Sequence, residues 1–138
     1  MVSGIAHPSL EHRPEAVRQF ALARHAAAHH ARLYAEAGFT VAIDDVLWPH
    51  DLAVFLEALE GLHTRKVFLA PDLETAQARN AARMGKNFDT AGLAPMIAAL
   101  HPSMLGVDYR AEGWTVLDTS SLTLEETVDA LLAEELLV

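Results

Sequence analysis

Two adjacent carboxylates, Asp44 and Asp45, are the residues of this sequence best placed to do chemistry, because they follow a short apolar run. The run at 38–43 (GFTVAI) is too short for a stable helix, so it predicts a strand over 38–46 that is buried on both faces. Open α/β sheets bind ligands at the carboxyl ends of their strands, where both aspartates would lie. Such an aspartate can hold the magnesium ion of a nucleotide. The alternative is an ordinary buried strand, with one aspartate capping the next turn.

Three cations, Arg79, Arg83 and Lys86, fall within eight residues of an otherwise acidic sequence. Arg79 and Arg83 share one face of a helix predicted over 73–84. Arginine forks bind phosphate oxygens in bidentate fashion, so the cluster could be a phosphate clamp. The alternative is a solvated cationic face that pairs with Glu74.

Arg24 interrupts the apolar face of the first predicted helix, 14–37. Its stem could lie on the apolar surface while the guanidinium reaches solvent. The functional alternative is an arginine that points from the helix into a phosphate site. His25 and His29 lie one turn apart on the same helix and could hold a metal ion, but the sequence favours solvated histidines there.

The composition limits the classes of function. The 138 residues carry a formal charge of −9, which argues against nonspecific binding to nucleic acid or to an anionic membrane. There is no cysteine, hence no disulfide, thiol catalysis or thiolate metal site. No signal peptide or membrane-spanning run is evident, and we expect a cytoplasmic protein.

The elements that must position these residues alternate between helix and strand, which predicts an α/β fold in one domain, 1–138. Pro14 suits the first turn of a helix that Gly38 ends, Asp72 suits an N-cap, and Thr123 to Glu126 form a capping box. We expect further strands at 66–70 and 113–118, and further helices after Pro49, around 96–100 and from Thr123. Strand 38–46, the following helix and strand 66–70 would form a right-handed parallel crossover.

The sequences of three segments, and their order along the chain, resemble those of small-molecule P-loop kinases of the chloramphenicol phosphotransferase-like and zeta-toxin-like group. The segments are VAIDDV, KVFLAPDLETAQARNAARMGK and VLDTSSLTLEETVDALL, and the similarity covers roughly residues 13 to 138. The resemblance implies a three-layer sheet with flanking helices and transfer of the γ-phosphoryl group of ATP to a small hydroxylated acceptor. It places Asp44 on magnesium and Asp45 toward the acceptor. Arg79 and Arg83, with help from Lys86, would act as lid arginines within a lid region at about 72–104.

One departure from that family is large: the sequence contains no G-x-x-x-x-G-K-[ST] loop. The fold would thus lack its first two strands, one of which lies between strands 38–46 and 66–70. The sheet must then close up, gape or borrow a strand from a partner, for example in a homodimer. We expect an N-terminally shortened phosphotransferase that binds ATP and Mg²⁺ weakly or not at all. The alternative is a catalytically dead kinase fold that serves as a binding or oligomerisation module.

Two further points follow from the sequence. A receiver-like signalling domain is disfavoured, because its aspartate pair should follow the first strand and a lysine should end the last strand. The acceptor molecule cannot be read from the pattern. The residues that could contact it lie in loops after sheet elements or near the lid: Trp48, His50, Phe88 and His101.

Overall fold

The computed structural model describes residues 13–83 and 90–135 of the chain. These residues form five α-helices, two 3-10 helices and a parallel sheet of two strands, so the predicted α/β class is confirmed. The sheet does not have the extent of the expected three-layer kinase fold. The chain divides into two compact units, 1–65 and 66–138, which are described separately.

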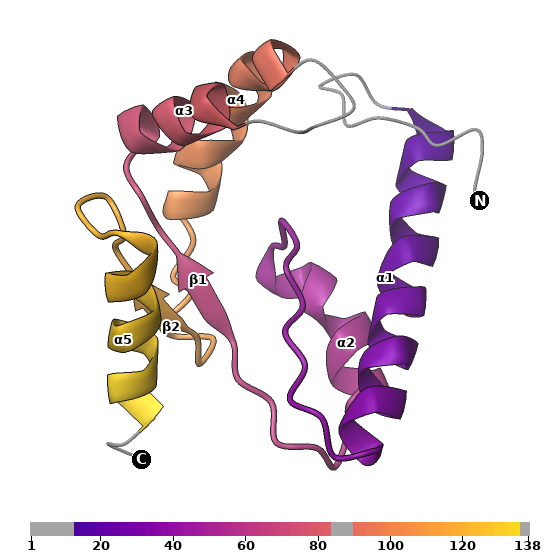
Figure 1. Cartoon of the computed structure of the whole chain (residues 1–138). Helices are drawn as coiled ribbons and strands as arrows, with labels where there is room; N and C mark the ends of the chain where they lie inside the picture. Colours follow the sequence, from indigo (N-terminus) through magenta and orange to yellow (C-terminus); the bar gives the residue numbers. More distant parts are fainter. Residues whose placement is uncertain (1–12, 84–89, 136–138) are drawn as a thin grey trace. The chain divides into compact units, whose positions relative to one another are not determined.

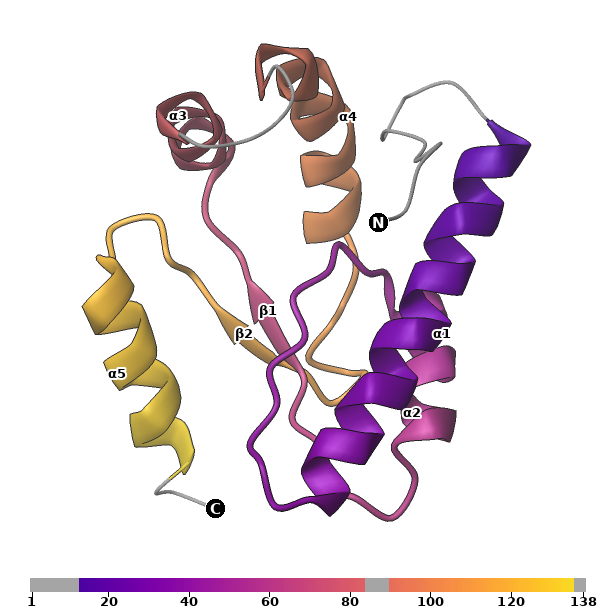
Figure 2. The same ribbon diagram turned by 45° about the vertical axis from the view of Figure 1, so that its right-hand side comes forward.

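The first unit is a long helix packed against a short one. Helix α1 (Pro14–Glu36) packs against α2 (Ala53–Ala58), as Figures 1 and 2 both show. The small side chains of Ala28 and Ala31 allow a close approach, and both are buried, as is Phe55 of α2. Arg32 joins the two helices, since its Nη1 donates to the carbonyl oxygens of Ala58 at 2.8 Å and Glu60 at 3.1 Å.

The ends of α1 follow the sequence cues. Pro14 occupies the first turn, and Arg18 binds Glu15 one turn away through two hydrogen bonds of 2.9 and 2.7 Å. At the other end Gly38 adopts a φ of 89°, and the N–H of Phe39 donates to the carbonyl of Tyr34 at 3.0 Å. Glycine adopts this left-handed conformation without a steric penalty, which explains why the helix ends there.

The predicted strand at 38–46 is wrong. Residues 39–48 have no regular secondary structure, and Phe39, Val41 and Ile43 are 62%, 39% and 39% exposed. A strand exists only when its main-chain groups pair with a neighbour, and the described part of the chain supplies none here. The crossover expected between 38–46 and 66–70 is therefore also absent from the described residues. The 3-10 helix η1 (Pro49–Leu52) then leads into α2, close to where a helix was expected.

The second unit contains the sheet. Strands β1 (Val67–Leu69) and β2 (Thr115–Leu117) are parallel, with Phe68 opposite Val116, so both predicted strands are confirmed within one or two residues. Between them run α3 (Leu73–Ala82), the 3-10 helix η2 (Thr90–Leu93) and α4 (Ala94–Leu105). Helix α5 (Leu124–Glu135) follows β2. Helix α3 packs against α4 and η2.

An aromatic cluster forms the core of this unit. The ring of Tyr109, which is 2% exposed, stacks on Phe68 of β1 with centroids 4.1 Å apart. Trp114 meets the Tyr109 ring edge-on at 5.3 Å. Edge-on and stacked ring pairs are favourable beyond the area they bury, so these three rings fix the segment around Tyr109 against the sheet.

Candidate functional site at the carboxyl edge of the sheet

The loops that leave β1 and β2 meet at the carboxyl edge of the sheet. The N–H of Ala70 donates to the carbonyl of Leu117 at 2.8 Å, and the N–H of Asp72 donates to Ser120 Oγ at 2.8 Å. The Ser120 hydroxyl in turn donates to Asp118 Oδ1 at 2.5 Å. Parallel strands place their carboxyl ends side by side, and this chain of hydrogen bonds joins residues 48 positions apart.

Both aspartates at this edge are held as carboxylates. Hydrogen bonds from the Ser120 hydroxyl and N–H lower the pKa of Asp118 below its ordinary value. The pKa of Asp72 is lowered chiefly by the N–H of Thr75, which donates to Asp72 Oδ1 at 2.7 Å as the N-cap bond of α3. The predicted N-cap is therefore confirmed, and the edge carries two negative charges at neutral pH.

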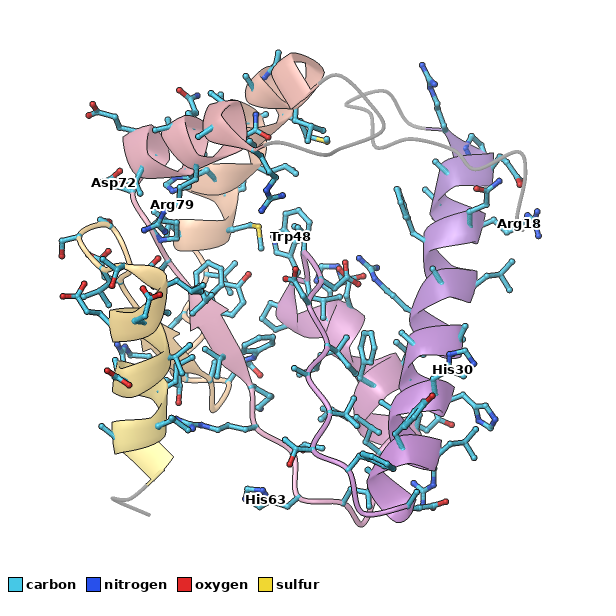
Figure 3. The ribbon with its side chains drawn as sticks, in the orientation of Figure 1. Arg18, His30, Trp48, His63, Asp72 and Arg79 are labelled. Carbon is cyan, nitrogen blue, oxygen red and sulfur yellow. The ribbon has the colours of Figure 1, made fainter. Side chains whose placement is uncertain are left out.

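Arg79 joins α3 to the loop after β2. Its Nη1 donates to Thr119 Oγ1 at 3.1 Å, and its Nη2 donates to the carbonyl oxygens of Thr119 at 2.7 Å and Leu122 at 3.0 Å. Figure 3 shows Arg79 extending from α3 on the side that faces this loop, with Asp72 at the start of the helix. The side chain predicted as a phosphate ligand thus acts as a brace between two elements of the second unit. Toward the described residues, these bonds use three of the five N–H groups of the guanidinium.

His101 reaches the same edge from α4. Its Nε2 lies 2.8 Å from the carbonyl oxygen of Pro71, a distance that requires the tautomer or charge state with a proton on Nε2. Sequence reasoning selected His101 only as a loop residue near the lid. Neither the Pro71 carbonyl nor the role of Ser120 was anticipated, because both depend on contacts between distant segments.

In the first unit, two aspartates, Asp45 and Asp51, both bind Arg24. Asp45 Oδ2 lies 3.0 Å from Arg24 Nε, and Asp51 Oδ1 lies 3.0 Å from Arg24 Nη1. Arg24 Nη2 also donates to the carbonyl of Val46 at 3.2 Å. The structure thus brings together Arg24 and Asp45, two residues predicted for the site, and adds Asp51, which is not among the predicted site residues. Arg24 here ties the loop at 45–51 to α1.

Two of the predicted acceptor contacts, Trp48 and His50, stack with ring centroids 6.4 Å apart, and the main-chain N–H of Trp48 donates to Asp51 Oδ2 at 3.3 Å. Asp44 is exposed, and Arg83 is an exposed residue that caps the end of α3. Lys86 and Phe88 lie outside the described residues. Among the residues that the structure describes, no group of three His, Asp or Glu side chains converges as a metal site would require.

A small cavity of about 170 Å³ lies beside the aromatic cluster, lined in part by Phe68, Tyr109 and Arg110. Pockets for drug-sized ligands typically enclose about 300–1,000 Å³. This cavity is too small for a nucleotide and does not include the carboxyl-edge residues.

Neither a protein-family model, nor a curated protein, nor a solved structure matches the sequence. Across the described residues, no helix has both the length and the apolar character needed to cross a membrane.

Proposed function

We propose that this chain has the framework of an ATP-dependent phosphotransferase for a small hydroxylated molecule, in a form that does not itself transfer a phosphoryl group. One observation carries the proposal: Asp72, Asp118, Ser120 and Arg79 meet at the carboxyl edge of a parallel strand pair. Ligands of parallel α/β sheets bind at this edge. Strands β1 and β2 would supply this edge, although their two-stranded sheet is not the three-layer arrangement that the resemblance implies.

Within this proposal the cations and carboxylates have separate roles. The guanidinium of Arg79 would turn toward nucleotide phosphates, and Arg83 and Lys86 follow it in the sequence. The resemblance assigns Mg²⁺ to Asp44 and the acceptor to Asp45, and both residues belong to the first unit. Mg²⁺ usually takes one or two carboxylates and completes its shell with phosphate oxygens and water, so a single exposed aspartate fits it. Bound Mg·ATP would supply the transferable phosphoryl group.

The missing loop is what makes the present form inactive. Kinases of this class hold the β- and γ-phosphates with a nest of main-chain N–H groups at a helix N-terminus and with a lysine. The 138 residues contain no G-x-x-x-x-G-K-[ST] motif that could build such a nest, since Gly85 and Lys86 are followed by Asn87. Side chains alone are a poor substitute, because the N–H groups of a nest are fixed in position before the ligand arrives.

Titration calorimetry with Mg·ATP tests the proposal for this chain. We expect no saturable binding at micromolar nucleotide and no phosphoryl transfer to a panel of small alcohols, sugars and antibiotics. Micromolar affinity together with transfer would contradict the expected inactivity.

The intact mass of the protein in its source cells tests the wider assignment. A mass above 15.0 kDa by roughly 4 kDa, about one strand-loop-helix-strand unit, would supply room for the loop. We then expect the longer protein to transfer a phosphoryl group and its Asp44→Asn variant to lose this activity. An endogenous mass of 15.0 kDa would overturn the phosphotransferase assignment in favour of the second candidate.

The second candidate is a catalytically inactive module that binds another chain. The sheet has only two strands in the described residues, and a two-stranded sheet is marginally stable by itself. A partner that extends the sheet would remove this weakness.

A further inference from the structure

The two strands of the sheet present different outer edges. The N–H of Ala70 bonds to Leu117 and the carbonyl of Lys66 bonds to Thr115, so residues 66, 68 and 70 direct their main-chain groups toward β2. Val67 and Leu69, which alternate with them, therefore direct their N–H and C=O groups away from β2. These two residues form the outer edge of β1.

The outer edge of β2 is covered by its own unit. The N–H of Trp114 donates to the carbonyl of Tyr109 at 3.0 Å, and Arg110 Nη2 donates to the carbonyl of Val116 at 2.7 Å. Charged side chains that occupy edge carbonyls are a common way to prevent a further strand from joining. No third strand covers β1 in the described part of the chain, and Leu69 is 48% exposed. Within the second unit, the sheet thus has one blocked edge, on β2, and one open edge, on β1, that no strand of this unit covers among the described residues.

We propose that the open edge of β1 pairs antiparallel with β1 of a second copy of this chain. The inference names the partner of the second candidate function, on which it rests, and does not depend on nucleotide binding. A two-fold axis at Phe68 places Val67 opposite Leu69 of the second copy, and Leu69 opposite its Val67. In this register each pair exchanges two main-chain hydrogen bonds, because both residues belong to the open edge. Phe68 then lies opposite Phe68 of the second copy, and this pair exchanges no main-chain hydrogen bonds.

Pro71 limits the length of the pairing, and the pairing is symmetric. Pro71 has no N–H group, so it ends the pairing at the carboxyl end of β1. The same surface serves both copies, which gives a closed dimer instead of a filament. The result is a four-stranded sheet, β2–β1–β1–β2, above the size at which sheets become stable.

The charges that flank β1 select the antiparallel orientation. Arg65 and Lys66 precede the strand and Asp72 follows it. Antiparallel pairing brings the basic end of one β1 beside the acidic end of the other, whereas in-register parallel pairing would place Lys66 beside Lys66. The Asp72 carboxylate is ionised, as its lowered pKa requires. The −9 charge of each chain opposes association, so the dimer should weaken at low salt.

Sedimentation equilibrium of the full chain without nucleotide, over a wide range of concentration, is the first test. We expect a reversible monomer–dimer equilibrium in the wild type. Leu69→Pro should shift it to monomer, because the lost N–H points outward and the β1–β2 ladder does not use it. The matched variant Val116→Pro removes the equivalent outward N–H from the blocked edge and should leave the dimer intact. A monomeric wild type, or a dimer that survives Leu69→Pro, overturns the proposal.

Cysteine cross-linking tests the register separately. The chain has no cysteine, so a single introduced thiol reports only on its own symmetry mate. Phe68→Cys should form an intermolecular disulfide under mild oxidation, because the axis brings both copies of residue 68 together. Leu69→Cys should not, because each residue 69 lies opposite residue 67. Cross-linking of Leu69→Cys in preference to Phe68→Cys would indicate parallel pairing and overturn the proposed register.

Discussion

Arg24 shows how a single side chain can fit a functional pattern and still serve a structural purpose. Its guanidinium binds two carboxylates and a carbonyl from the loop at 45–51. The side chains of Arg24, Asp45 and Asp51 are 22%, 32% and 24% exposed, so water screens these pairs only in part. The cluster therefore fixes the loop on α1 more firmly than a surface ion pair would.

A double-mutant cycle of Arg24→Ala and Asp51→Ala should give a coupling free energy of about 1 kcal/mol, at the upper end of the range for exposed ion pairs. Urea unfolding measures it. The matched control is the pair Arg18 and Glu15 on α1, whose side chains are 63% and 57% exposed and should couple less. Equal coupling in the two cycles would contradict a positioning role for Arg24.

Acid should destabilise the second unit through Asp118. Because folding lowers the pKa of this carboxyl from 3.8, its contribution to stability is present above pH 3.8 and is lost as the pH falls through the folded pKa. Asp118→Asn should make the decline in unfolding free energy below pH 3.8 shallower. Ser120→Ala keeps the carboxyl but removes the hydroxyl that lowers its pKa, so it should act in the same direction. If the unfolding free energy of both variants depends on pH as in the wild type, Asp118 is not the cause of the loss of stability in acid.

At the scale of elements, the local cues located the helices well. Pro14 and Gly38 bracket α1, and Asp72 caps α3. Thr123 and Glu126 form the predicted capping box, with bonds of 2.8 and 3.2 Å. These interactions span three or four residues, so the sequence alone contains both partners. The strand at 38–46 was predicted from an apolar run, and its pairing partner could not be read from that run.

Gly38 is the position where other residues are most disfavoured, since its φ is 89°. Gly38→Ala should cost about 1–2 kcal/mol, the price of a left-handed conformation for a residue with a Cβ. Gly92→Ala is the matched control, because its φ is not positive and an added Cβ meets nothing within 4 Å at either position. Urea unfolding followed by circular dichroism at 222 nm would compare them. Equal costs would show that φ does not limit position 38.

At the scale of the whole molecule, the chain divides into two compact units, and the single domain that the sequence predicts stays a prediction. Each unit contains one tryptophan, Trp48 or Trp114, which allows the units to be followed separately by fluorescence. Phe55 is 4% exposed in the first unit, so Phe55→Ala should destabilise that unit by about 3–5 kcal/mol.

We expect Phe55→Ala to lower the urea midpoint reported by Trp48 and to leave that of Trp114 nearly unchanged. The measurement uses Trp114→Phe and Trp48→Phe backgrounds to isolate each signal. Coincident shifts of both midpoints would instead support a single cooperative domain.

The sequence by itself determined the helices and their caps, because each depends on residues close together in the chain. Its apolar runs also located the two strands, although these strands pair across 48 positions. Only the tertiary structure decided which side chains meet. Arg79 donates a hydrogen bond to Thr119, which lies 40 positions away in the sequence, and Arg24 donates one to Asp51, which lies 27 positions away. It also decided that 39–48 forms no strand, since a strand requires main-chain partners from elsewhere. Long side chains and extended segments depend on remote neighbours, and no local pattern specifies those.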